Sequence, residues 1–185
     1  NGVIDAVYIT TPGSGYIETP TISISANSGS ASGATAVISG ETSKKGGPAS
    51  SKYITKKVVL DPGFDSGDLN VFLTAYRPVN TDIQVYYKIL NRNDTAAFND
   101  QNWQLMTDIS AGSASNSLSR DDLKEYVAAP GTGGSPDNFV TYTSTSGVTY
   151  NQFSQFAIKI VLATSDSART PYLKDLRVLA LPSGA

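Results

Sequence analysis

Acidic residues gather at two places where paired carboxylates could do chemistry. Residues 61–68 read Asp-Pro-Gly-Phe-Asp-Ser-Gly-Asp, and Asp121 stands next to Asp122. Two carboxylates at a fixed separation can hydrolyse glycosidic bonds, and several oxygen ligands in one loop can hold calcium. The first segment is equally typical of a turn at Pro62-Gly63, and it lacks the spacing of an EF-hand. The acidic pair fits the first turn of a helix, so we predict no metal site and no catalytic site at either place.

Most other catalytic mechanisms need residues that this chain lacks. The 185-residue chain contains no His and no Cys, which excludes His general bases, thiol nucleophiles, disulfides and thiolate zinc sites. Ser-Lys pairs occur at Ser43-Lys44 and Ser51-Lys52, but the motifs S-x-x-K and G-x-S-x-G do not occur. Gly13-Ser14-Gly15 lacks the Lys and the strand–helix context of a phosphate-binding loop. We therefore expect a protein that is not an enzyme and uses no cofactor.

Charge and hydropathy limit the kinds of partner. The chain has 14 Lys and Arg against 16 Asp and Glu, a formal net charge of -2. Proteins that bind nucleic acid instead concentrate basic residues on one face. No stretch approaches the roughly 18 consecutive apolar residues that a membrane-spanning helix needs. We expect no nucleic-acid partner and no membrane insertion.

Aromatic side chains give the best argument for a binding function. Flat rings suit the C–H surfaces of sugars, so a row of exposed rings on a sheet could bind a glycan. The alternative is that Tyr is simply common in half-buried strands, and both interpretations stay open. The candidate contacts for a glycan or a protein partner are Trp103, Tyr86, Tyr142 and Tyr150.

The pattern of apolar residues predicts an all-β fold, an antiparallel, jelly-roll-like β-sandwich over residues 52–182. Strict alternation places Ile83 and Tyr87 on one face of their strand and Tyr86 and Lys88 on the other. The predicted strands are Tyr53–Leu60, Asn70–Tyr76, Asp82–Leu90, Trp103–Met106, Phe139–Thr143, Phe153–Ala163 and Tyr172–Leu181.

Two further segments interrupt or precede this domain. Ser119–Tyr126 is predicted as a short helix with Ser119 as N-cap, inside a long connection over residues 107–138. Residues 1–41 predict a small Gly/Ser-rich module of three short strands, which is too small to be stable without a neighbour. Residues 42–51 have the Gly, Pro and Ser content of a linker. We place the domain boundary there.

The N-terminal segment resembles a known repeat. Tyr8–Tyr16 reads YITTPGSGY and is followed by Thr19–Ile24 and Ser32–Ala36. Together they are similar to a GSGY-type β repeat that recurs in structural proteins of tailed bacteriophages. One copy is present, and it covers about the first fifth of the chain.

The larger domain resembles a β-sandwich module of large virion proteins from contractile-tailed phages, particularly those of cyanobacteria. The segments that carry the resemblance are Tyr53–Asp65, Leu69–Pro78, Ile83–Leu90, Phe156–Leu162 and Leu173–Leu181. The resemblance implies a virion structural protein of the tail, baseplate or fibre, located in the phage particle, with other virion proteins or copies of itself as partners. It implies no catalytic residues. A carbohydrate-binding adhesin domain that recognises a host surface glycan is the alternative.

Overall fold

The computed structural model describes residues 40–111, 114–115, 119–130, 140–164, 166 and 168–182. These residues form antiparallel sheets and one short 3-10 helix, η1 (Phe98–Asp100). The N-terminal module expected over residues 1–41 lies outside the described residues except at its end. Within the described residues, no helix is long and apolar enough to cross a membrane.

Five strands form the first sheet, which we call sheet A. Four of them lie in the order β1 (Lys52–Ile54), β10 (Gln155–Thr164), β4 (Thr81–Leu90) and β5 (Gln104–Leu105). The fifth, β2 (Val58–Val59), pairs with β10 further along the same edge as β1. The central pair β4–β10 is continuous over its whole length.

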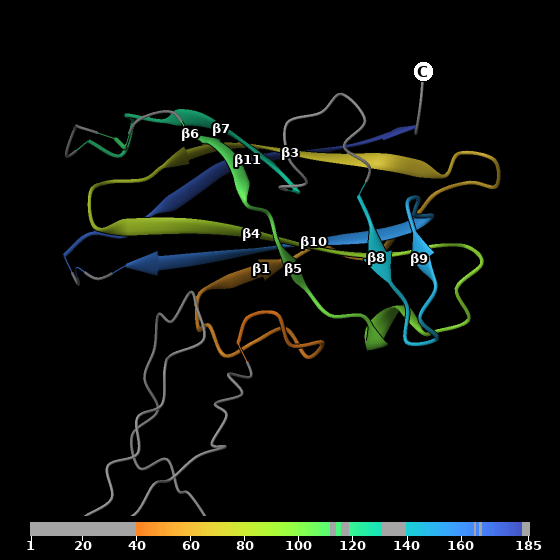
Figure 1. Cartoon of the computed structure of the whole chain (residues 1–185). Helices are drawn as coiled ribbons and strands as arrows, with labels where there is room; N and C mark the ends of the chain where they lie inside the picture. The colour runs from red at the N-terminus through yellow and green to blue at the C-terminus, as the bar shows by residue number, and fades with distance from the viewer. Residues whose placement is uncertain are drawn as a thin grey trace, which may run out of the picture.

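Four strands form the second sheet, sheet B. Their order is β11 (Tyr172–Pro182), β3 (Ser66–Tyr76), β7 (Lys124–Ala129) and β6 (Asp108–Ala111). A small hairpin of β8 (Tyr142–Thr143) and β9 (Thr149–Tyr150) lies beside these sheets. Figure 1 shows sheets A and B as two stacked layers.

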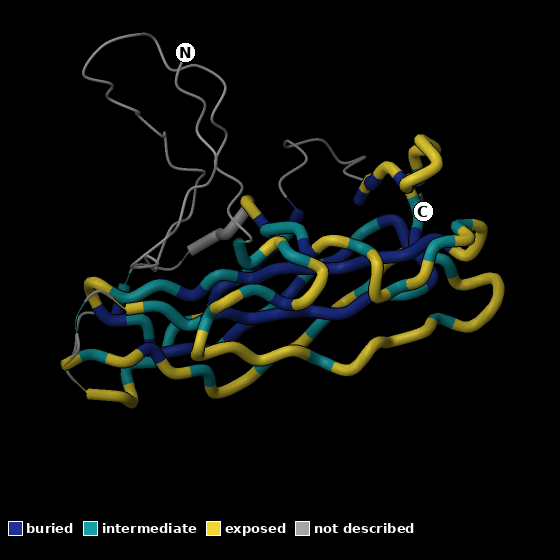
Figure 2. The backbone as a smooth tube through the Cα atoms, turned by 90° about the horizontal axis from the view of Figure 1, so that it is seen from below, coloured by how far each residue is buried: buried dark blue, intermediate teal, exposed yellow. Residues whose placement is uncertain are grey.

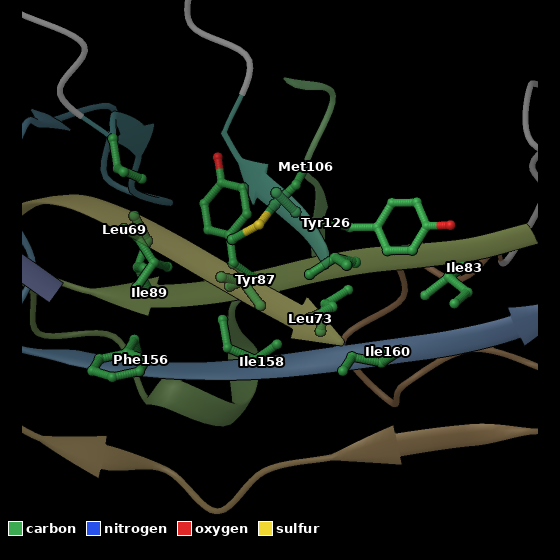
Figure 3. Packing of buried hydrophobic residues seen from close by; sticks show 14 of the residues in the cluster. Leu69, Leu73, Ile83, Tyr87, Ile89, Met106, Tyr126, Phe156, Ile158 and Ile160 are labelled. Carbon is green, nitrogen blue, oxygen red and sulfur yellow. The ribbon is translucent and has the colours of Figure 1, made fainter. Parts of the chain in front are cut away.

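The main hydrophobic core lies between the two layers, and both contribute to it. Leu69, Leu73 and Tyr126 enter it from sheet B, whereas Ile89 and Ile158 enter from sheet A (Figure 3). Complete burial of such a side chain stabilises the fold by about 1.5–3 kcal/mol. Figure 2 shows the buried residues mainly along the long strands β3, β4 and β10, whereas β1, β2 and much of β11 are exposed, as are most connections. The predicted all-β sandwich is confirmed, while its jelly-roll-like connectivity stays a prediction.

The predicted strands agree with the structure where they are long. Those over 70–76, 82–90, 153–163 and 172–181 correspond to β3, β4, β10 and β11. The strand expected over 53–60 is divided into β1 and β2, and those expected over 103–106 and 139–143 shrink to two residues each.

The helix predicted over Ser119–Tyr126 is wrong. The Ser119 hydroxyl accepts a hydrogen bond from the Asp121 backbone N–H at 3.2 Å, but this bond stabilises a turn. From Lys124 onward the chain is strand β7, which pairs with β3 on one side and β6 on the other. Tyr126 and Ala128 alternate into the core, so burial in the sheet outweighs the local preference for a helix.

Candidate functional site

The outer face of sheet A carries a second buried cluster, on the side away from the core. Alternation along β4 and β10 places Tyr86, Lys88, Ala157 and Lys159 on this face, where Trp103 joins them. Lys88 is only 3% exposed and Lys159 is fully buried. Lysine is almost never fully buried unless it is paired, so this face requires an explanation.

A segment that we call the strap, residues 40–51, covers this face. Figure 1 shows the strap in orange on the side of sheet A that faces away from sheet B. The backbone N–H of Trp103 donates to the Thr42 carbonyl at 2.9 Å, and the Ala49 N–H donates to the Glu41 carboxylate at 2.6 Å. Composition indicated a linker over residues 42–51, and the structure gives these residues specific contacts with the sheet. The domain boundary itself stays a prediction.

The strap needs glycine where it reverses direction. Gly46 and Gly47 have φ values of 97° and 78°, a region that other residues seldom adopt. A Cβ atom on Gly47 would also clash with the side chain and backbone of Glu41. The absence of a side chain at Gly47 therefore leaves room for Glu41, whose carboxylate reaches Lys159 in the sheet.

Lys159 is held by the strap. Its Nζ donates to the Glu41 carboxylate at 2.9 Å, to the Glu41 carbonyl and to the Gly46 carbonyl at 3.2 Å. The ring centroid of Tyr86 lies 4.3 Å from the same Nζ. Burial lowers the pKa of Lys159, and the hydrogen bond and charge of Glu41 oppose this shift. The arrangement satisfies a buried cation, as a structural ion pair does.

Lys88 lies beside Lys159 and has weaker partners. Its Nζ donates to the Lys44 carbonyl at 3.2 Å and lies 4.9 Å from the Trp103 ring and 5.8 Å from the Phe98 ring. Burial lowers the pKa of Lys88, and the neighbouring charge of Lys159 lowers it further. Cation–π contacts and one carbonyl compensate a buried ammonium less completely than a carboxylate does.

A pocket of about 200 Å³ opens between the strap, η1 and sheet A. It has a cationic part and an apolar part. Lys44, Lys45, Lys57 and Lys88 supply the first, and Ile54, Phe98, Trp103 and Ala157 supply the second. Such a combination can hold an anionic group that carries some apolar surface.

The structure divides the four sequence-predicted site residues into two pairs. Tyr86 and Trp103 lie together beneath the strap, and both are buried. Tyr142 and Tyr150 stack on each other at 5.5 Å between ring centroids, within or against the main core. The four residues therefore do not form one row, although the first pair belongs to the cluster next to the pocket.

Tyr142 has a hydrogen-bonding role. Its hydroxyl accepts from the Asn91 backbone N–H at 2.8 Å and donates to the Asp94 carboxylate at 2.9 Å. Asn91 is itself buried. The hydroxyl thus links the β8–β9 hairpin to the loop that follows β4.

We expect Tyr142→Phe to lower the free energy of unfolding by about 1–3 kcal/mol, because the buried Asn91 N–H loses its acceptor. Urea unfolding followed by circular dichroism measures this difference. Tyr150→Phe is the matched control: its hydroxyl bond to the Asn93 carbonyl is exposed and 3.3 Å long, so about 0.5 kcal/mol or less is expected. Equal losses in both variants would contradict the assigned role of the Tyr142 hydroxyl.

The acidic segments have structural partners. Asp65 forms an ion pair with Arg92 at 2.8 Å, and Phe64 N–H closes a turn onto the Asp61 carbonyl at 3.1 Å. Asp122 pairs with Lys124 at 3.0 Å. Among the residues that the structure describes, no group of three or more Asp and Glu side chains is placed to hold a metal ion.

Strand β11 is a long edge strand. It pairs with β3 on one side, and no other described strand pairs with it. Leu173, Leu176 and Val178 pack against the core, whereas Leu179 and Leu181 are exposed. An edge of this kind can accept a strand from another chain.

Comparison with known proteins adds no identification: no family model, no curated protein and no solved structure matches the chain.

Sequence reasoning missed Glu41, Lys88 and Lys159 as members of a site. One signal was present, since both lysines alternate with aromatic or apolar residues in strands that are otherwise rich in Val, Ile and Tyr. A lysine in the middle of a central strand is unfavourable unless a partner covers it. The partner lies more than 40 residues away from Lys88 and more than 100 from Lys159.

Proposed function

We propose that the chain is a structural component of a tailed-phage virion, associated with the tail, baseplate or fibre, and that it acts through protein–protein contacts without enzymatic activity. Its partners are other virion proteins or further copies of the same chain. The resemblance of the repeat and sandwich segments supports the virion role.

The observation that supports an assembly role most directly is the outer edge of β11, with which no described strand pairs. This strand has 11 residues, and its outward side chains include the exposed Leu179 and Leu181. Proteins commonly protect such edges with charges, bulges or covering segments. Register shifts occur between Leu173 and Asp175 and between Leu181 and Pro182, while Asp175 to Leu181 pair regularly and Leu179 and Leu181 give this half of the strand an apolar surface.

Immunogold electron microscopy on particles of the phage that encodes the chain tests the proposal. An antibody raised against residues 52–182 is expected to label the tail, baseplate or fibre. Denatured particles on the same grid show whether the epitope is accessible. Unlabelled native and denatured particles would rule out the virion role.

The edge itself is tested by Leu179→Lys, which places a charge where an added strand would pack. We expect the amount of the chain per particle to fall about tenfold or more, corresponding to about 1.4 kcal/mol of lost contact energy. Quantitative immunoblotting of purified particles measures this amount. Val148→Lys is the matched control, because Val148 and Leu179 are both 48% exposed and Val148 lies at the β8–β9 turn. Equal incorporation of both variants would exclude the β11 edge as the contact.

A second candidate function is recognition of a host surface carbohydrate. The pocket beside Trp103 supports it, because an aromatic wall next to hydrogen-bond donors is a common arrangement in sugar sites. Saturable binding on a glycan array that is lost on substitution of pocket residues would establish this function.

A further inference from the structure

The pocket beneath the strap has more positive charge than the fold requires. Among the described residues that line it, four are Lys and none is Asp or Glu, although the whole chain has a formal net charge of -2. Like charges placed close together in a partly buried region destabilise one another. Departures of this kind from a stable arrangement are typical of functional sites.

Lys88 is the centre of this excess charge. Lys159 has the Glu41 carboxylate at 2.9 Å, whereas no carboxylate of the described residues lies within 4.0 Å of Lys88 Nζ. Asp100 is the acidic residue near the rim, and it pairs with Lys44 at 3.6 Å through exposed side chains. A ligand oxyanion would therefore supply the carboxylate that Lys88 lacks.

The size and walls of the pocket specify what else the ligand carries. A volume of about 200 Å³ is more than a lone carboxylate needs. The walls beside the lysines include Phe98 and Trp103. The ligand must therefore combine an oxyanion with a compact group that has an apolar face.

We propose that this pocket binds one carboxylate-bearing sugar unit, with its carboxylate at Lys88 and Lys57 and one face of its ring against the partly exposed Phe98, above the buried Trp103. This inference rests on the second candidate function and is independent of the virion role. An acidic side chain of a protein partner has the same charge, but its thin stem would leave most of the aromatic wall uncovered. The sugar fits both parts of the pocket.

The chain provides its own optical probe, because Trp103 is its single tryptophan and lines the pocket. Titration of the full chain with D-glucuronate at constant ionic strength is expected to change the Trp103 emission saturably. D-glucose lacks the charge and acetate lacks the ring, so each is expected to bind about tenfold or more weakly than glucuronate. Added sodium chloride should weaken the binding of glucuronate, since salt screens charge pairs at an open pocket.

Two pocket variants and one control assign the response to the site. Lys88→Met removes the charge and keeps a chain of similar length, and we expect it to weaken glucuronate binding about tenfold or more. Lys57→Met changes an exposed side chain, so it tests the same pocket without altering buried packing. Lys174→Met, on the exposed side of β11, should bind glucuronate as the unchanged chain does.

Each alternative outcome contradicts the proposal in a distinct way. Absence of a saturable change with glucuronate up to its solubility limit, or unchanged binding in both pocket variants, would show that the pocket holds no such ligand. If acetate binds as tightly as glucuronate, the pocket recognises a carboxylate alone and not a sugar ring. A Glu-containing peptide that binds more tightly than glucuronate would assign the pocket to an acidic protein segment. Immunogold labelling of particles does not depend on any of these results, so failure here leaves the virion role untouched.

Discussion

Replacement of Glu41 by alanine is expected to lower the free energy of unfolding by about 3–5 kcal/mol, because it leaves a fully buried ammonium without its carboxylate. Lys159 would keep the two strap carbonyls and the Tyr86 ring as partners. The Ala49 N–H would also lose its acceptor. Urea unfolding at neutral pH measures the change, and limited proteolysis within the strap should become faster.

The matched control is Glu125→Ala, which removes an ion pair of similar length. Glu125 contacts Arg177 at 3.0 Å, and both side chains are more than half exposed. Exposed pairs contribute about 0–1 kcal/mol, so a small effect is expected. A second test joins Glu41→Ala to Lys159→Met, since removing both charges should recover much of the loss. If Glu41→Ala has no more effect than Glu125→Ala, the strap does not hold the buried lysine in solution.

The second large effect is a loss of stability at alkaline pH. Burial raises the pKa of Tyr86 and of Tyr87 to about 12, and it also raises the pKa of Tyr142. Above pH 10 an unfolded tyrosine loses its proton while these three keep theirs, so the folded state binds more protons and stability falls as pH rises. Each tyrosine contributes a slope of about 1.4 kcal/mol per pH unit, and the three together contribute about 4 kcal/mol per pH unit.

Lys88 and Lys159 act in the opposite direction at lower pH. Their folded pKa values are lowered, so stability rises with pH until the unfolded lysines lose their protons near pH 10.5. The steep loss should therefore appear between about pH 10.5 and pH 12. Urea midpoints at pH 8, 10, 11 and 11.5 measure the profile. Tyr87→Phe should reduce the slope of stability against pH by the contribution of one tyrosine, about 1.4 kcal/mol per pH unit. Equal midpoints at pH 11 and pH 11.5, where the lysines no longer contribute a slope, would contradict this assignment.

The sandwich could be predicted from the sequence because its long strands alternate strictly. In β4 the residues Ile83, Val85 and Ile89 face the core as predicted, since a period of two leaves only one way to bury them. Strand β7 could not be predicted in the same way. Its six residues follow a Ser119-Arg-Asp-Asp sequence that imitates a helix start, and only pairing with β3 and β6 makes the segment extended.

The candidate site was less predictable than the fold. Alternation correctly placed Tyr86 and Lys88 on the outer face of sheet A, but it gives no information about what covers that face. The strap is rich in Gly, Ser and Lys, so its composition resembles that of a solvated connection. Its contacts with the sheet join residues far apart in sequence, such as the ion pair between residues 118 positions apart, and no local pattern reveals such a contact.

The Glu41–Lys159 contact also determines where mechanical load enters the domain. A pull on the chain that precedes Gly40 reaches the middle of β10 through this contact before it reaches β1 at Lys52. The ten residues between Glu41 and Lys52 could span up to about 35 Å if the contact broke, and β1 would then carry the tension at the edge of the sheet. We therefore expect the buried lysine to hold the strap against sheet A under small forces and to release it under larger ones.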